Sequence, residues 1–316
     1  MSARGEWIGM GTSFALKGCF TALVTPFKGS GVNPPVDYEA FKRLVELQNE
    51  GRVAGIVPCG TTGESPTLSH EEHNKLVSLS VEACRGIVIA GTGSNCTREA
   101  IAMTKHAADA GAHASLQVCP YYNKPNQEGL FRHFAAVAEA ADIPMILYNI
   151  PGRSGREIAP ETMARLAAEH SNVVAVKEAS GKEETWKKIR ETCPKSFTIL
   201  SGNDNETLNI MKNYGAAGAV SVASNVIPRR MRDFVSLGLE KRFAEMGKEG
   251  ARLDDFFEKL FIDTNPIMVK TALGLLGLPA GGFRLPMCET SGENAEKMGR
   301  CLAALGLGQK TGVVKA

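Results

Sequence analysis

The sequence predicts an α/β protein, a (β/α)₈ barrel with a C-terminal helical extension. Eight short runs of small and β-branched apolar residues recur along the chain, and helix-patterned segments lie between them. The runs are almost continuously apolar rather than alternating, which is typical of strands buried on both faces of a parallel sheet. Strand–helix alternations between residues 19 and 225 supply the eight units of a closed barrel. A doubly wound open sheet is the alternative, because periodicity does not show closure.

The predicted strands span residues 19–27, 54–62, 86–93, 113–120, 143–151, 173–180, 197–204 and 218–225. The first helix has a buried face made by Phe41, Leu44 and Val45. Ser69 and Glu72 form an S-x-x-E capping box, which indicates the start of the second helix.

The later helices are predicted from the same two signals, an apolar face and a residue suited to the first turn. The helix after the fourth strand has one apolar stripe, formed by Leu130, Phe134, Val137, Ala138 and Ala141. Pro160 suits the first turn of the helix after the fifth strand. From residue 228 onward the chain contains no further strand candidate. We therefore divide it into an N-terminal extension (1–17), a catalytic barrel (18–227) and a C-terminal helical region (228–316).

Composition argues against several classes of function. A hydrophobic content of 43% with 22% charged residues is that of a soluble globular protein. The net charge of +2, without a block of Lys or Arg, argues against nucleic acid or an acidic membrane as partner. No apolar run is long enough for a membrane span, and the N-terminal segment "MSARGEWIGMGTSFALKG" lacks the apolar region of a secretory signal. The eight cysteines are scattered without a C-x-x-C pair, which favours reduced thiols in a cytoplasmic protein over disulfides or a zinc site.

Reactive side chains gather where the predicted strands end, which is the edge of such a barrel that carries the chemistry. They are Thr61 and Thr62 after the second strand, Tyr121 and Tyr122 after the fourth, Tyr148 and Arg153 after the fifth, and Lys177 at the sixth. Taken singly, each has an ordinary explanation: a Gly/Thr turn, a packed ring or a solvated cation. Together they form one candidate site, with no Asp/Glu/His cluster suited to a metal.

In the segment "NVVAVKEASG", Lys177 directly follows the apolar run 173–176. The amine of Lys177 determines the reaction that we expect. An amine can attack a ketone to form an imine, which then acts as an electron sink for deprotonation of the neighbouring carbon. The amine must be uncharged when it attacks, and we expect burial among the valines to favour that form. Hydroxyls of tyrosine and threonine can relay the protons, and Arg153 can hold a carboxylate through a bidentate pair. The residues thus indicate a Schiff-base lyase or aldolase for a small keto acid.

The ordered motifs "GTTGES", "PYYNKPNQEG", "LYNIPGRSG", "VVAVKEASG", "LSGND" and "GAVSV" resemble those of the dihydrodipicolinate synthase (4-hydroxy-tetrahydrodipicolinate synthase) family. This family belongs to the pyruvate-dependent class I aldolases. The resemblance runs from about Gly18 to Leu307, nearly the whole chain.

The resemblance implies that Lys177 forms the imine with pyruvate and that Tyr148 beside it donates and accepts protons. Thr61 would link Tyr148 to Tyr122 in a hydroxyl relay, with Tyr122 supplied by the neighbouring subunit. The family's homotetramer, a dimer of dimers, is the expected assembly.

The resemblance also implies the substrate contacts. Thr62 would bind the pyruvate carboxylate, Val220 would offer its backbone carbonyl near the imine, and Arg153 would hold the carboxylate of L-aspartate 4-semialdehyde. The product would be (4S)-4-hydroxy-2,3,4,5-tetrahydrodipicolinate, on the route to diaminopimelate and lysine. No cofactor is expected, because the imine itself is the electron sink.

A second site is implied for the feedback inhibitor L-lysine, at Ser65, Pro66, His70, His73, Asn95, Glu99 and Tyr121. The alternative is an ordinary solvated helix, because the capping box already explains how the segment "HEEH" begins and residues at i and i+3 share a helix face.

Two other functions stay open. One is another pyruvate-dependent aldolase that cleaves sialic acid or a keto-deoxy sugar acid, against which Arg153 is the main argument. The other is a non-catalytic barrel that senses a small acid, against which the complete set of hydroxyls and Lys177 argues.

Overall fold

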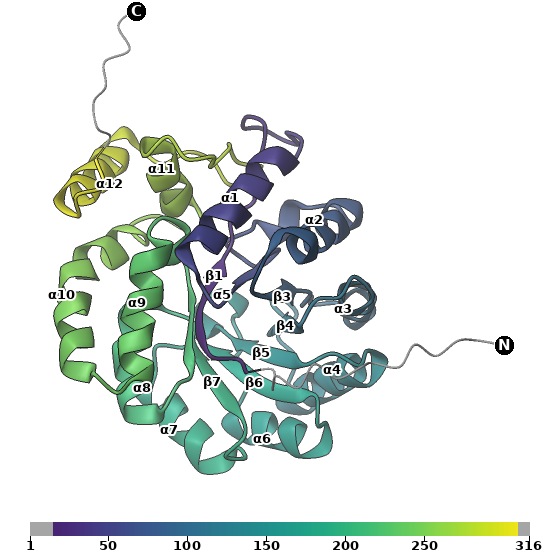
Figure 1. Cartoon of the computed structure of the whole chain (residues 1–316). Coiled ribbons are helices and arrows are strands. Elements are labelled where there is room, and N and C mark those ends of the chain that lie inside the picture. The colour runs from purple at the N-terminus through teal and green to yellow at the C-terminus, as the bar shows by residue number, and fades with distance from the viewer. Residues whose placement is uncertain (1–14, 309–316) are drawn as a thin grey trace, which may run out of the picture.

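The computed structural model describes residues 15–308, which form a closed barrel of parallel strands surrounded by helices (Figure 1). The strands are β1 (Gly18–Ala22), β2 (Gly55–Val57), β3 (Ile87–Gly91), β4 (Ala114–Val118), β5 (Met145–Asn149), β6 (Val173–Glu178), β7 (Thr198–Ser201) and β8 (Gly218–Ser221). The barrel closes where β8 pairs with β1, with Gly218 opposite Gly18. The predicted barrel is therefore confirmed and the open sheet is excluded. The predicted strands were longer because they included the loops at the rim.

Helices alternate with the strands and continue after β8. They are α1 (Tyr38–Gly51), α2 (His70–Ala83), α3 (Thr97–Asp109), α4 (Gln127–Ala140), α5 (Pro151–Ser154), α6 (Pro160–Glu169), α7 (Glu183–Thr192), α8 (Thr207–Tyr214), α9 (Pro228–Leu239), α10 (Phe243–Lys259), α11 (Ile267–Leu275) and α12 (Gly292–Ala304). Three 3₁₀ turns, η1 (Ser65–Thr67), η2 (Asp204–Glu206) and η3 (Ala223–Asn225), lie in the loops at the rim. The predicted capping box is present: the Glu72 N–H donates to Ser69 Oγ, and the Ser69 N–H donates to Glu72 Oε2.

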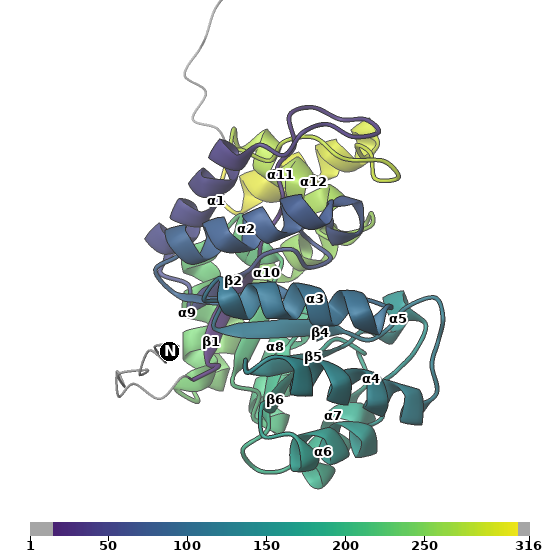
Figure 2. The ribbon, with the colours of Figure 1, turned by 90° about the vertical axis from the view of Figure 1, so that its right-hand side faces the viewer.

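The helices after β8 extend the barrel on one side. α9 packs against β1, β8 and α1, whereas α10 packs against α8, α9 and α12, and α11 packs against α12. α11 also lies near α1 in both views (Figures 1 and 2). The division at residues 227 and 228 stays a prediction, and the packing of α9 favours placing that helix with the barrel. Residues 1–14 of the predicted extension and 309–316 of the helical region lie outside the described part.

Apolar side chains form one layer inside the barrel and another between the barrel and the helices, and successive residues of a regular strand alternate between the two layers. In β6 the alternation is interrupted once, because Val174 and Ala175 both pack with the inner layer. Val173 and Val176 pack in the layer between the barrel and the helices. Ala175 packs inside the barrel, in a cluster with Tyr148 and residues of the other strands. Alternation from Val176 therefore directs Lys177 inward. The expectation that the flanking valines surround the amine is wrong for Val173 and Val176, because both face the helices.

No helix within residues 15–308 has the length and apolar character needed to cross a membrane.

Candidate active site

Lys177 lies near the C-terminal end of β6, inside the rim of the barrel, and is only 6% exposed. Its partner in the register with β5 is Tyr148, and Lys177 Nζ lies 4.0 Å from the centroid of the Tyr148 ring. Tyr148 is 5% exposed and belongs to the inner cluster. Among residues 15–308, no carboxylate lies within ion-pair distance of Lys177 Nζ. The amine is thus buried against a phenol rather than neutralised by a salt bridge.

A buried carboxyl group, that of Asp204, lies near the ends of β7 and β8. Asp204, in η2 after β7, is 2% exposed, and its Oδ2 accepts the backbone N–H groups of Val222 and Ala223 at 3.0 and 2.8 Å. Burial raises the pKa of Asp204, whereas these hydrogen bonds and the Lys177 ammonium act in the opposite direction. Asp204 therefore anchors the chain just after Val220. Asp204 was predicted only as part of the motif "LSGND", although an Asp three residues after the end of a buried strand was a signal of its own.

The segment "GTTGES" after β2 folds into consecutive turns. The N–H of Gly63 donates to Gly60 O at 3.0 Å, and the N–H of Glu64 donates to Thr61 O at 3.1 Å. Thr61 borders a cavity of about 40 Å³ that Tyr148 also lines. Thr62 is 3% exposed. The turns therefore bring both threonines to the rim that carries Lys177.

A residue that was not predicted for the site contacts Thr62. Asn265, between α10 and α11, donates from Nδ2 to Thr62 Oγ1 at 2.9 Å. Its backbone carbonyl accepts a hydrogen bond from Arg153 Nη2 at 3.2 Å. Arg153 itself is exposed on α5. The C-terminal region thus supplies a link between the two residues predicted to bind carboxylates.

A buried ion pair holds the end of the same turn. Lys270 Nζ, on α11, donates to Glu64 Oε1 at 2.7 Å, to Thr25 O at 3.0 Å and to the carbonyl of Gly282. Both charged side chains are almost fully inaccessible to solvent. Burial lowers the pKa of Lys270, and Glu64 opposes this shift. The lone charge in the apolar segment "NPIMVKTALGLLG" was the available signal for this pair.

Arg284 extends this cluster towards α2. It is 1% exposed and donates from Nη1 and Nη2 to the two carboxylate oxygens of Glu72, at 2.7 and 2.6 Å. It also bonds the carbonyls of Pro34 and Thr67. The residues around "GTTGES" are therefore fixed by groups that come from the last part of the described chain.

The structure brings together most of the residues predicted for catalysis and substrate binding, but not all. Lys177, Tyr148, Thr61 and Thr62 share one rim, and Val220 lies in the inner cluster at the end of β8. Tyr122, in contrast, is 90% exposed and has a left-handed backbone conformation, with φ of 70°. Within this chain it points into solvent.

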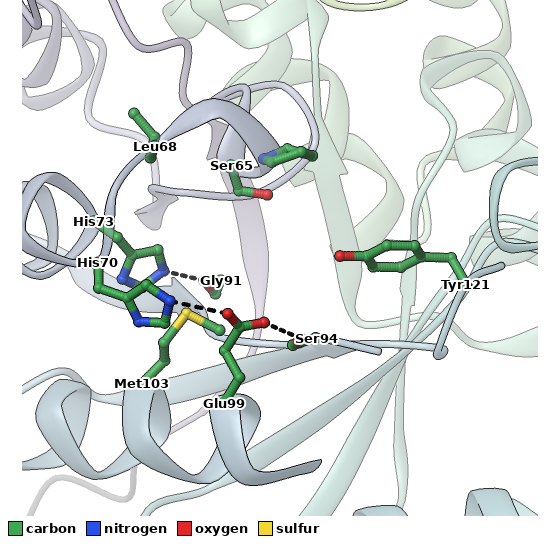
Figure 3. A pocket seen from close by; sticks show the side chains of 11 residues that line it. Ser65, Leu68, His70, His73, Gly91, Ser94, Glu99, Met103 and Tyr121 are labelled. Atoms are coloured by element: carbon green, nitrogen blue, oxygen red, sulfur yellow. Dashed lines mark hydrogen bonds and ion pairs between the residues drawn. The ribbon is translucent and has the colours of Figure 1, made fainter. Parts of the chain in front are cut away.

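A second cavity of about 150 Å³ lies between η1, α2, α3 and the chain after β4 (Figure 3). Its lining includes six of the seven residues predicted for a second site, namely Ser65, Pro66, His70, His73, Glu99 and Tyr121. The seventh, Asn95, does not line the cavity; its Nδ2 donates to the backbone carbonyl of Tyr121 at 3.2 Å.

The polar groups of this cavity form two separate hydrogen-bonded groups, one around Glu99 and one at His73 (Figure 3). His70 Nε2 lies 2.9 Å from Glu99 Oε1, and Ser94 Oγ donates to the other carboxylate oxygen. His73 Nε2 lies 2.8 Å from the carbonyl of Gly91, and burial lowers the pKa of His73. Burial and the charge of Glu99 both raise the pKa of Tyr121. Glu99 is the one carboxyl side chain among the described residues that line this cavity.

The chain matches proteins of one family over most of its length. Residues 15–305 match the model of the dihydrodipicolinate synthetase family. A 4-hydroxy-tetrahydrodipicolinate synthase of Methanothrix thermoacetophila is 48% identical over 89% of this chain and 94% of its own.

Solved structures agree with this match. The dihydrodipicolinate synthase of Aquifex aeolicus is 45% identical, with a TM-score of 0.90 over 93% of this chain and 99% of its own. The enzyme of Cyanidioschyzon merolae, solved with lysine bound, is 41% identical, with a TM-score of 0.88 over 92% and 98% of the two chains. The chain therefore belongs to the dihydrodipicolinate synthetase family.

Proposed function

We propose that this protein is a 4-hydroxy-tetrahydrodipicolinate synthase, a lyase that condenses pyruvate with L-aspartate 4-semialdehyde in the biosynthesis of diaminopimelate and lysine. The observation that carries the proposal is the buried amine of Lys177, which lies against Tyr148 at the rim of the barrel. Membership of the family supports the choice of substrates.

The reaction begins when Lys177 Nζ attacks the keto carbon of pyruvate and water leaves, which gives an imine. Loss of a proton from the methyl group gives an enamine, because the imine takes up the electron pair. The enamine carbon attacks the aldehyde carbon of the second substrate. The amino group of that substrate then attacks the imine carbon, closes the ring and releases Lys177, with (4S)-4-hydroxy-2,3,4,5-tetrahydrodipicolinate as product.

The neighbouring groups bind and relay protons. Thr62 binds the carboxylate of pyruvate, Arg153 binds the carboxylate of the semialdehyde, and the Val220 carbonyl lies near the imine. Tyr148 exchanges protons with the reacting atoms and passes them to Thr61.

The relay ends at Tyr122 of a neighbouring subunit, because the exposed Tyr122 of one chain is free to enter another chain's site. We place this contact in a homotetramer built from two dimers. As an enzyme of amino-acid biosynthesis, the protein is expected in the cytoplasm. Sedimentation of a fully active monomer would contradict the shared relay.

Borohydride reduction in the presence of pyruvate tests the imine. Mass spectrometry of the digest should find the reduced pyruvate adduct on Lys177 and none in the Lys177→Ala variant. Lys187→Ala is the matched control, because that lysine lies on α7 with a largely exposed side chain. An unmodified Lys177 would refute the mechanism.

Substrate competition tests the choice among aldolases. Turnover of L-aspartate 4-semialdehyde should exceed that of N-acetylneuraminate and 2-keto-3-deoxygluconate. Binding of pyruvate without any turnover would instead favour a sensor of small acids.

We also propose that L-lysine binds in the cavity of Figure 3 as a feedback inhibitor. The carboxylate of Glu99 can pair with an ammonium group of the ligand, and the Tyr121 hydroxyl can donate to its carboxylate. Titration calorimetry should detect L-lysine binding, weakened at least about ten-fold in Glu99→Gln, because an uncompensated ammonium is costly to bury. No heat at millimolar L-lysine would refute this second proposal.

A further inference from the structure

We propose that Asn265 is a positioning residue for the keto acid: its side-chain amide fixes the Thr62 hydroxyl as a hydrogen-bond donor to the substrate carboxylate. The inference rests on the proposed function, in which Thr62 binds pyruvate. Asn265 is 6% exposed, and 203 residues separate it from Thr62 along the chain.

The proposed role depends on the direction of the hydrogen bond between Asn265 and Thr62. A threonine hydroxyl has a single hydrogen to donate, and an amide Nδ2 can only donate. Asn265 Nδ2 donates to Thr62 Oγ1 at 2.9 Å, so the hydrogen on Thr62 must point elsewhere. Within residues 15–308, no acceptor takes a hydrogen bond from Thr62 Oγ1. That hydrogen is therefore available to a carboxylate at the rim.

Asn265 is itself held firmly enough to impose this orientation. Its backbone carbonyl accepts a hydrogen bond from Arg153, and α11 begins two residues later. On that helix Lys270 is bonded to Glu64, which follows Thr62 by two residues in the turn. The turn and the segment that orients its hydroxyl are thus joined at two points.

The same asparagine contacts both carboxylate-binding residues in different ways. It contacts Thr62 through its side chain and Arg153 through its backbone. A side-chain substitution should therefore disturb pyruvate more than the semialdehyde. Asn265 Oδ1 is buried and has no partner among the described residues, so the site retains one unused acceptor beside Thr62.

Two substitutions at Asn265 test whether the direction of its hydrogen bond matters, rather than only its contact with Thr62. Asn265→Ala removes the donor and should raise the KM for pyruvate about five-fold, as expected for one lost hydrogen bond. Asn265→Asp replaces the donor with an acceptor that takes the Thr62 hydrogen, and it adds a negative charge near the carboxylates of both substrates. It should raise this KM about fifty-fold or more. The KM for L-aspartate 4-semialdehyde should change less than about two-fold in Asn265→Ala.

A double-mutant cycle distinguishes positioning from a structural role. In a Thr62→Val background, Asn265→Ala should have no further effect on the KM for pyruvate, because the oriented hydroxyl is already gone. Asn213→Asp is the charge-matched control, since Asn213 is exposed on α8 and bonds only its neighbour Asn209. Thermal unfolding of each variant checks that the fold is retained.

The outcomes separate this proposal from the one on which it rests. Failure of the wild-type chain to trap pyruvate on Lys177 would refute the function itself. If the wild-type chain is active and traps pyruvate, the KM of Asn265→Ala for pyruvate is decisive. A value within two-fold of the wild-type KM would overturn the positioning role. An equal and undiminished effect of that substitution in the Thr62→Val background would overturn it too. If Asn265→Asp does not fold, the Asn265→Ala and Thr62→Val cycle decides alone.

Discussion

The buried pair of Lys270 and Glu64 gives a sharp prediction for stability. Lys270→Met keeps an unbranched side chain as far as Cε but removes the ammonium, and with it three hydrogen bonds to Glu64, Thr25 and Gly282. It also leaves the Glu64 carboxylate, whose side chain is 2% exposed, without its charge partner. Breaking such a pair from one side costs about 3–5 kcal/mol, most of it the penalty of an unpaired buried charge. We expect the free energy of unfolding to fall by that amount.

Urea unfolding followed by circular dichroism measures this loss. Adding Glu64→Gln to Lys270→Met should recover at least about half of it, because no buried charge then remains unpaired. Lys297→Met is the control: Lys297 pairs with Glu293 on the surface of α12, and loss of an exposed pair costs less than about 1 kcal/mol. A cost for Lys270→Met no larger than that of Lys297→Met would refute the reasoning.

Three further predictions follow from the site and from one buried histidine. Tyr148→Phe should lower kcat about 10²–10⁴-fold in a coupled assay, because a proton-transfer group is lost, while borohydride still traps Lys177. Mixing inactive Lys177→Ala and Tyr122→Phe chains should restore part of the activity, whereas a relay within one chain would restore none. Burial lowers the pKa of His133 to about 4, so between pH 6.5 and 4 the unfolded chain binds a proton that the folded chain does not. His133 should therefore lower stability by about 2 kcal/mol from pH 7 to 5, and His133→Gln should remove that part of the dependence. The part that comes from His73 and His113, whose pKa values burial also lowers, should remain.

Local patterns were sufficient to predict the barrel and the residues that end its strands. Strands buried on both faces need apolar side chains at nearly every position, so a charge such as Lys177 is conspicuous. The same pattern could not tell which apolar side chains face the amine. Val173 and Val176 face the helices, whereas Val174 packs against the inner cluster. A register shift between Met145 and Ile146 of β5 interrupts the simple alternation at this point, so alternation alone would not have placed Val174.

Contacts between distant segments were beyond sequence analysis. Asn265 and Lys270 lie in a helical region whose composition says nothing about the turn at Thr62 and Glu64. Only the closed fold brings them together. Asp204 was visible as a polar residue at a strand end, but its bonds to Val222 and Ala223 depend on how the loops after β7 and β8 pack.

The hydrogen bonds between the turn "GTTGES" and the C-terminal region determine at what point of its synthesis the chain can become active. Asn265 is made 203 residues after Thr62, an interval of about 10–40 s at translation rates of about 5–20 residues per second. Until then Glu64 lacks its lysine and Thr62 lacks its amide partner. A nascent chain held on the ribosome before residue 265 should neither trap pyruvate nor bury Glu64, so activity begins only as the last helices emerge.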